Sequence, residues 1–341
     1  MDAMDPMRET ARELVAPGKG ILAADESGGT IKKRFDQIGV DSTEQSRRDY
    51  RQLLFTTPGL GEHISGVILF DETIRQSTDD GTPLTDVLEK AGVIAGIKVD
   101  AGAKPLALFE GETVTEGLDG LRERLTEYRE LGARFAKWRA TYFIGDDLPS
   151  DFAVLANGHA MARYAALCEE AGIVPIVEPE VLMDGDHDLA ACEAATGRAL
   201  QVLYAQMTDH RVDLTGTLLK VNMVVPGKGA ATQVDDTMIA EATLRTLRAH
   251  VPEEVPGIVF LSGGMTDEEA TSRLNEINRQ GGAPWGISFS YGRALQQGPL
   301  KAWGGSASNV EAAQAALAHR ARMNGLARNG EWSPSMEESA A

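Results

Sequence analysis

A lysine within an otherwise apolar stretch is the residue of this sequence best suited to chemistry. Lys220 lies in residues 217–223, whose sequence is TLLKVNM. Burying an ammonium group is costly unless the group is paired or deprotonated. Desolvation and a neighbouring cation both lower the pKa of a lysine, and the neutral amine attacks carbonyl carbons. Lys220 is therefore a candidate nucleophile, with Lys137 as the candidate cation; the alternative is a lysine whose ammonium reaches solvent.

Two pairs of charged residues alternate with single uncharged residues. Lys137 and Arg139 flank Trp138, and Glu178 and Glu180 flank Pro179. If both segments are strands, each pair points to one side of its strand. Carboxylates that face cations form an acid/base system whose pKa values are pushed apart. The alternative is an ion-pair network with a purely structural role.

Eight short apolar runs occur along the chain, and these candidates lie within three of the runs. They are residues 20–25, 66–72, 94–100, 135–140, 173–180, 217–223, 257–264 and 285–292. Continuous apolar runs suit parallel strands buried on both faces, and the stretches between them, such as 118–132 and 188–207, are rich in helix formers. The pattern predicts an α/β fold, a single-domain (β/α)8 TIM barrel, with a doubly wound open sheet as the alternative. In a barrel the active groups lie at the carboxyl ends of the strands, where these candidates fall.

Strand ends also supply groups that suit phosphate. Glycines, backbone amides and a cation bind phosphate together, and the last two strands of a barrel commonly hold one. The residues that fit there are Ser262, Gly263, Ser290, Gly292 and Arg293, and a second anionic pocket could be formed by Ser27, Thr30, Arg34 and Lys98. Alternatively, Lys32, Lys33 and Arg34 form a solvated helix face. Asp25 ends the first run as a further candidate carboxylate, or caps a turn before Ile31.

Metal and nucleotide motifs do not emerge from the sequence. Residues 184–188 resemble the start of a calcium loop, but Leu189 and Ala195 replace its glycine and glutamate, so we interpret the segment as an acidic turn that caps a helix. The six histidines lack metal-ligand spacing, and neither Gly-Lys pair belongs to a P-loop. We expect no metal and no cofactor.

Composition narrows the class of protein. The 341 residues carry a net charge of −18 with 43% hydrophobic residues, which indicates a globular chain and argues against nucleic acid or an anionic membrane as partner. The chain has two cysteines, an acidic N-terminal stretch in place of a signal peptide, and a longest charge-free run, 280–292, that is too short for a bilayer. We expect a cytoplasmic protein.

These residues resemble class I fructose-1,6-bisphosphate aldolases over about residues 17–305. Seven ordered segments carry the resemblance: 20–27, 96–100, 135–139, 176–180, 216–220, 261–264 and 289–295. The resemblance implies a (β/α)8 barrel, usually a homotetramer, that acts without metal in glycolysis and gluconeogenesis. It implies cleavage of fructose 1,6-bisphosphate to dihydroxyacetone phosphate and glyceraldehyde 3-phosphate.

The resemblance also implies residue roles. Lys220 matches the Schiff-base lysine, Glu178 the acid/base, Lys137 the lysine that assists it, Asp25 the carboxylate that helps deprotonate the C4 hydroxyl, and Glu180 a carboxylate that orders the lysines. One phosphate site matches Ser262, Gly263, Ser290, Gly292 and Arg293, and the other end of the substrate matches Ser27, Arg34, Lys98 and Arg139. Thr30 stands where many relatives carry serine.

We expect residues 1–325 to form the barrel and residues 326–341 to form an acidic, disordered tail without the terminal tyrosine of animal relatives. Two other functions stay open. The chain could be a Schiff-base aldolase for another phosphorylated ketose, or a non-catalytic scaffold with an acidic surface.

Overall fold

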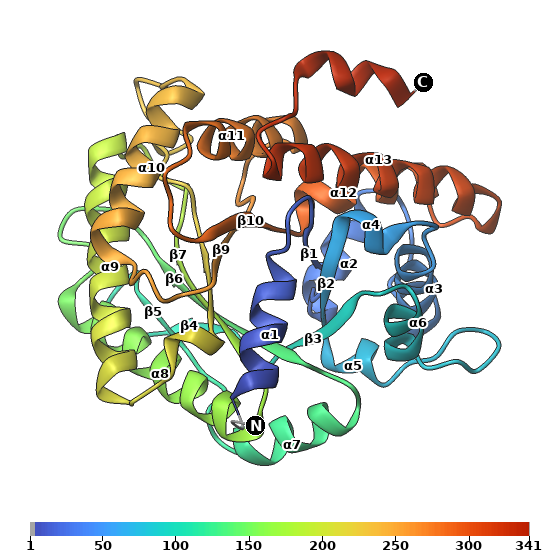
Figure 1. The fold of residues 1–341 in the computed structure, drawn as a ribbon, viewed down its shortest axis with the longest axis horizontal. Helices are drawn as coiled ribbons and strands as arrows, with labels where there is room; N and C mark the ends of the chain where they lie inside the picture. Colours follow the sequence, from blue (N-terminus) through green and yellow to red (C-terminus); the bar gives the residue numbers. More distant parts are fainter. Residues whose placement is uncertain (1–3, 341) are drawn as a thin grey trace.

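The computed structural model describes residues 4–340, and eight parallel strands form a closed barrel at its centre (Figure 1). Around the barrel the strand order is β1-β10-β9-β8-β7-β6-β3-β2. The strands are Gly20–Ala23 (β1), Ile64–Leu69 (β2), Ile94–Lys98 (β3), Phe135–Tyr142 (β6), Val174–Val181 (β7), Leu218–Val221 (β8), Gly257–Phe260 (β9) and Gly286–Tyr291 (β10). All eight predicted runs form strands, and the closed order confirms the barrel over the open sheet.

One strand begins earlier than the apolar run suggested. β2 starts at Ile64, which pairs with Gly20 just before a register shift between β1 and β2. Ser65, just before the predicted run, is polar and therefore did not indicate a strand. Its Oγ is nevertheless buried and donates to the carbonyl oxygens of Leu14 (2.6 Å) and Gly20 (3.0 Å). These hydrogen bonds offset the cost of burying the hydroxyl, so the strand can extend over it.

Helices surround the barrel in Figure 1 and connect its strands. After Asp5–Leu14 (α1), the helices up to β6 are Gly28–Asp36 (α2), Glu44–Phe55 (α3), Leu60–His63 (α4), Asp71–Ile74 (α5), Leu84–Lys90 (α6) and Leu121–Glu130 (α7). The later helices are Asp151–Ala171 (α8), Leu189–Asp209 (α9), Asp236–His250 (α10), Asp267–Gln280 (α11), Arg293–Trp303 (α12) and Val310–Arg328 (α13), with 3₁₀ turns at Leu214–Gly216 (η1), Ala307–Asn309 (η2) and Pro334–Ala340 (η3). None of the helices in residues 4–340 is long and apolar enough to cross a membrane.

Polar side chains fix where the crossover helices begin. Ser150, Asp188 and Asp235 each accept a hydrogen bond from a backbone N–H in the first turn of α8, α9 and α10, and Thr266 forms a capping box at α11. Such caps satisfy amides that a helix leaves unpaired. Asp188 therefore has the capping role that the sequence predicted for the acidic turn, since its Oδ1 accepts from the Ala191 amide at 2.8 Å.

The apolar core has two parts. The larger part fills the layer between the barrel and its helices, and the smaller part fills the barrel interior near the amino ends of the strands. In the interior, Phe135, Leu218 and Val259 pack with Leu14 and Ala11 of α1. The helix α1 therefore closes this end of the barrel, and any pocket must open at the carboxyl ends of the strands.

A small hairpin between β3 and α7 escaped the sequence analysis. It pairs Ala103–Pro105 (β4) with Thr113–Thr115 (β5) in antiparallel register. Each strand has three residues, and β4 is exposed, so the apolar signal that marked the barrel strands is missing here.

The C-terminal segment differs from the disordered tail that we expected. The expected boundary at residue 325 falls inside α13, and Trp332 beyond it is buried. Glu337 in η3 accepts hydrogen bonds from Trp332 Nε1 (2.9 Å) and Arg320 (2.5 Å), and its Oε2 lies 2.9 Å from His319 Nε2. An aromatic anchor and an ion pair thus hold the tail against α13. Residues 1–3 of the expected barrel range and residue 341 of the expected tail lie outside the described part of the chain.

Candidate active site

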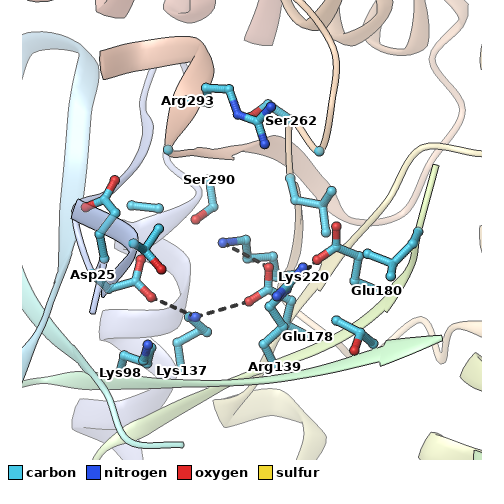
Figure 2. A pocket seen from close by; sticks show the side chains of 18 of the residues that line it. Asp25, Lys98, Lys137, Arg139, Glu178, Glu180, Lys220, Ser262, Ser290 and Arg293 are labelled. Atoms are coloured by element: carbon cyan, nitrogen blue, oxygen red, sulfur yellow. Dashed lines mark hydrogen bonds and ion pairs between the residues drawn. The ribbon is translucent and has the colours of Figure 1, made fainter. Parts of the chain in front are cut away.

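A pocket of about 480 Å³ opens at the carboxyl ends of the barrel strands. Figure 2 shows charged side chains entering it from several strands. The lining includes every site residue predicted from the sequence: Asp25, Ser27, Thr30, Arg34, Lys98, Lys137, Arg139, Glu178, Glu180, Lys220, Ser262, Gly263, Ser290, Gly292 and Arg293. The closed barrel brings them together because the carboxyl halves of its strands and the segments that follow them meet at this end; Lys137, Glu178 and Lys220 lie within strands, whereas Thr30 and Arg34 lie in α2.

Four of these residues form a chain of alternating charges. Lys137 Nζ lies 2.8 Å from Asp25 Oδ2 and 3.4 Å from Glu178 Oε2, while Lys220 Nζ lies 3.2 Å from Glu178 Oε1 (Figure 2). The side chains of both lysines are 5% exposed and that of Glu178 is 3% exposed. Every charge in this desolvated group therefore has a partner of opposite sign, as burial requires.

The partners determine the protonation of the group. Burial alone would raise the pKa of Asp25, but Lys137 and Lys220 hold it well below its usual range. Burial likewise opposes ionisation of Glu178, yet the same two lysines keep its pKa below the ordinary value. Burial alone would lower the pKa of Lys137, and Asp25 and Glu178 instead raise it well above its ordinary value. Near neutral pH the chain thus holds two carboxylates around the Lys137 ammonium.

This arrangement places a primary amine beside a proton acceptor. Glu178 Oε1 is close enough to accept a proton from Lys220 Nζ. The other carboxylate oxygen, Oε2, lies 3.4 Å from the Lys137 ammonium and forms no hydrogen bond within residues 4–340. Asp25 is held by Lys137 and does not cap α2, whose N-cap residue is Ser27. The geometry suits nucleophilic attack by an amine with proton transfer alongside.

Glu180 and Arg139 form a second ion pair beside the first. Glu180 Oε2 pairs with Arg139 Nε, and the Arg139 backbone amide donates to Asp100 Oδ2 at 3.3 Å. The resemblance implied that Glu180 orders the lysines, but the ion pair found for Glu180 within residues 4–340 is with Arg139. The charged side chains are thus divided into two adjacent groups.

The predicted phosphate residues at β9 and β10 surround one corner of the pocket. Ser262 and Gly263 follow β9, Ser290 lies in β10, and Gly292 and Arg293 begin α12. Ser290 Oγ is buried and has no hydrogen-bond partner among residues 4–340. A buried hydroxyl without a partner is costly, and a ligand oxygen in the pocket would satisfy it.

The second predicted anion pocket is more loosely organised. Ser27 Oγ lies 3.2 Å from Thr30 Oγ1, Thr30 is exposed, and Lys98 Nζ lies 5.3 Å from the centre of the Phe70 ring. Arg34 lines the pocket but is paired with Glu26. Lys32 follows the alternative interpretation, since it is exposed and bonded to Asp36 on the surface of α2.

Comparison with known proteins decides the family. A model of the family "Fructose-bisphosphate aldolase class-I" matches residues 6–341. A "Probable fructose-bisphosphate aldolase class 1" of Xanthomonas campestris is 54% identical over 331 residues, which cover 97% of this chain and 99% of the relative. The chain belongs to the class I fructose-bisphosphate aldolase family.

Other members of the aldolase family are also similar to this chain. The cytosolic fructose-bisphosphate aldolase 4 of Arabidopsis thaliana is 54% identical over 321 residues, covering 94% of this chain and 82% of the relative. The solved structure of the Plasmodium falciparum aldolase, in complex with TRAP and a small-molecule inhibitor, superposes with a TM-score of 0.96 at 45% identity, covering 98% of this chain and 96% of that one. The recognition of this lyase family and of its barrel from the sequence is therefore confirmed.

Four charged pocket residues of this family member were missed as site residues by the sequence analysis: Glu26, Asp100, Asp184 and Lys228. Glu26 pairs with both Arg34 and Arg51, Asp100 orients the Arg139 backbone, and Lys228 lies at the rim. The position of Asp100 at the end of an apolar run was a usable signal. Lys228 offered only a Gly-Lys pair that fails as a P-loop, and its loop follows β8 without any strand-like pattern.

Proposed function

We propose that this chain catalyses the reversible aldol cleavage of fructose 1,6-bisphosphate through an imine between the substrate C2 and Nζ of Lys220. The products are dihydroxyacetone phosphate and glyceraldehyde 3-phosphate. The observation that carries the proposal is the buried 3.2 Å contact between Lys220 Nζ and Glu178 Oε1, inside a pocket lined by cations and by glycine-rich strand ends. A covalent intermediate of this kind divides one difficult step into easier ones.

Imine formation needs an acid/base group beside the amine. The neutral Lys220 nitrogen attacks C2, after which the nitrogen loses a proton and the former carbonyl oxygen takes one up to give a carbinolamine. A second proton on that oxygen lets it leave as water while the nitrogen lone pair forms the C=N bond. Glu178 is placed to accept and return these protons because its Oε1 contacts Lys220. Lys137 assists through its positive charge, which lies 3.4 Å from the opposite oxygen of Glu178.

Cleavage needs a base at the far side of the imine. Removal of the C4 hydroxyl proton by the Asp25 carboxylate forms the aldehyde C=O, and the electrons of the C3–C4 bond pass to the iminium nitrogen, leaving an enamine. Asp25 is held as a carboxylate by Lys137, 2.8 Å away. Exclusion of water from this corner strengthens these charge interactions.

The two phosphates are assigned to the two cationic ends of the pocket. Ser262, Gly263, Ser290, Gly292 and Arg293 take the phosphate near Lys220, because β8 and β9 are neighbours with Lys220 opposite Val259. Ser27, Thr30, Arg34, Lys98 and Arg139 take the other end, with Glu180 holding Arg139. These cations must attract a phosphorylated substrate against a chain charge of −18.

We further propose a cytoplasmic homotetramer. The cytosolic name of one plant relative and the two free, buried cysteines support the location. Exposed Leu108, Phe152 and Leu155 provide apolar surface for self-association. Sedimentation equilibrium tests the tetramer, and a monomer at micromolar concentration would contradict it.

Borohydride trapping tests the covalent route. Dihydroxyacetone phosphate is added, the imine is reduced to a secondary amine, and the labelled peptide is mapped. We expect irreversible inactivation with the label on Lys220, no label in Lys220→Ala, and activity that EDTA leaves unchanged. A label on another lysine, or cleavage activity retained by Lys220→Ala, would contradict the proposal.

A further inference from the structure

Lys228 reaches the rim of the pocket from a loop that is fixed along its backbone. The loop after β8 pairs with the loop after β7 through three consecutive amides. The N–H groups of Gly227, Lys228 and Gly229 donate to the carbonyl oxygens of His187 (2.8 Å), Met183 (2.9 Å) and Gly185 (2.8 Å), respectively. The position of the Lys228 Cα is therefore set, and only the side chain retains freedom.

The Lys228 side chain lies against the loop after β9. A methyl group placed at Gly264 would overlap both Cε and Nζ of Lys228, so glycine is needed there for the ammonium to come so close. Gly264 follows Ser262 and Gly263, which are part of the phosphate corner of the pocket. A side chain from the loop after β8 thus brings a positive charge to the loop that follows β9.

Lys228 forms a weak ion pair with Asp184. Its Nζ lies 3.7 Å from Asp184 Oδ1, and the two side chains are 49% and 65% exposed. Exposed ion pairs of this length contribute little to stability and are readily exchanged. The Lys228 ammonium is therefore available to a stronger anion that enters the pocket.

Two hydrogen-bond donors near Lys228, the Gly264 amide and the Ser290 hydroxyl, lack a strong acceptor. The Gly264 amide donates to the Met183 sulfur at 3.3 Å, and a thioether is a weak acceptor. Ser290 Oγ, in the same corner, is buried without a hydrogen-bond partner in the described part of the chain. Phosphate oxygens would serve these donors and the ammonium together.

We propose that Lys228 is a further substrate-binding residue, whose ammonium exchanges Asp184 for the phosphate held on the Ser262–Gly264 loop. The inference rests on the proposed function, which supplies a phosphorylated ketose as ligand. Because this corner adjoins Lys220, the phosphate is the one on C1, next to the carbon that forms the imine. Lys228 is a binding residue and leaves the bond-making steps unchanged.

Concentration-dependent trapping tests the proposal. The dihydroxyacetone phosphate concentration that gives half-maximal borohydride labelling of Lys220 is measured in wild type, in Lys228→Met, and in Lys90→Met as a control. Lys90 is an exposed lysine of α6 outside the pocket lining, so its loss matches the change in net charge. We expect about a 5- to 10-fold higher concentration for Lys228→Met and no change for the control. Equal half-saturation in all three proteins overturns the role of Lys228.

Steady-state kinetics give a second readout. Lys228→Met should raise KM for both fructose 1,6-bisphosphate and fructose 1-phosphate by a similar factor, leave kcat unchanged, and reduce the dependence of KM on salt. A fall in kcat and thermal stability without a rise in KM would indicate a structural role and overturn the proposal. A rise in KM for the bisphosphate alone would place Lys228 at the other phosphate and overturn it as well.

Gly264 supplies an independent perturbation. Gly264→Ala should displace the Lys228 side chain and raise KM in wild type, but should add little in a Lys228→Ala background, where the methyl group finds space. Equal effects in both backgrounds would contradict the contact.

If wild type is not labelled on Lys220, the proposed function fails, and inorganic phosphate becomes the probe. A weaker thermal stabilisation of Lys228→Met by phosphate then still supports the role, and an equal one overturns it.

Discussion

The two halves of the barrel interior are built from the same strands but have opposite character. Near the amino ends, the inward side chains are apolar, as with Phe135, Ile176 and Leu218. Two residues further along each of these strands come Lys137, Glu178 and Lys220 in turn. Because side chains alternate along a strand, this step of two keeps the same inward direction and changes only the height in the barrel.

The change of character separates two tasks. The lower half gains stability from buried apolar surface and is closed by α1. The upper half buries ions, which stabilise a fold poorly even when each is paired, and which serve catalysis because water is excluded. The comparison predicts that changes in the lower half lower stability first, whereas changes in the upper half lower activity first.

The largest effect is expected from Lys220→Met. If Lys220 is the nucleophile, as proposed, its loss should lower kcat by about 10⁴-fold or more. The free energy of unfolding should fall by less than the ~3–5 kcal/mol that breaking a buried ion pair can cost, because Glu178 keeps its 3.4 Å contact with Lys137. A coupled assay of cleavage and urea unfolding measure the two quantities. Substantial residual turnover, or a large drop in the urea midpoint, would break the proposed separation of tasks.

The lower half is tested at Phe135, whose ring fills the interior. Phe135→Ala should lower the free energy of unfolding by about 3–5 kcal/mol, as expected when a buried aromatic side chain leaves a cavity. Turnover per folded molecule should be retained, because Lys137 remains paired with residues of other strands. Urea unfolding and active-site titration check the two parts of this prediction.

A matched variant sharpens this test. A methyl group at Gly96 of β3 would overlap the Phe135 ring, so Gly96→Ala should cost about 1–3 kcal/mol in wild type. In a Phe135→Ala background the same change should cost much less, since the cavity accepts the methyl group. Additive effects would show that the ring does not fill the space assigned to it.

The strands and the cluster of charged residues in the pocket were predictable from the sequence for one physical reason. A strand buried on both faces must be apolar throughout, so a charged residue at its end is conspicuous, as with Lys220 and Asp25. The resemblance to aldolases then added roles that spacing alone left open. The charged strand ends and the short segments shared with aldolases are both local features of the sequence. The closed barrel then brings these residues close together in space.

Which charged side chains pair with each other was not predictable in the same way. The pairing of Glu180 with Arg139 and of Arg34 with Glu26 depends on which side chains meet across the closed barrel. The docking of the tail through Trp332 and Glu337 also depends on contacts with α11 and α13, to Asn275 and Arg320. Lys228 was missed because its place is set by backbone pairing between two loops, which leaves no periodic pattern.

The smallest expected effect is a change with pH in the stability difference between wild type and Asp25→Asn. It again distinguishes the charged upper half of the barrel interior from the apolar lower half. Lys137 and Lys220 hold the pKa of Asp25 below its ordinary value of 3.8, although burial alone would raise it. A depressed pKa in the folded state contributes stability above the unfolded value, and that contribution is lost as pH falls through the folded value. Asp25→Asn should therefore be less stable than wild type by about 1.5–3 kcal/mol at pH 7 and pH 5, since a hydrogen bond to a charged group is lost.

Below about pH 4 the stability gap between wild type and Asp25→Asn should shrink, because the unfolded wild-type chain binds a proton that the folded chain resists. The gap for Phe135→Ala should stay constant over the same range, since an apolar cavity does not titrate. Urea midpoints at pH 7, 5 and 3.5 measure both gaps. A gap for Asp25→Asn that does not narrow at all between pH 5 and pH 3.5, where a narrowing of roughly 0.6 kcal/mol is expected, would mean that the stability of the upper half does not depend on the ionised Asp25 carboxylate.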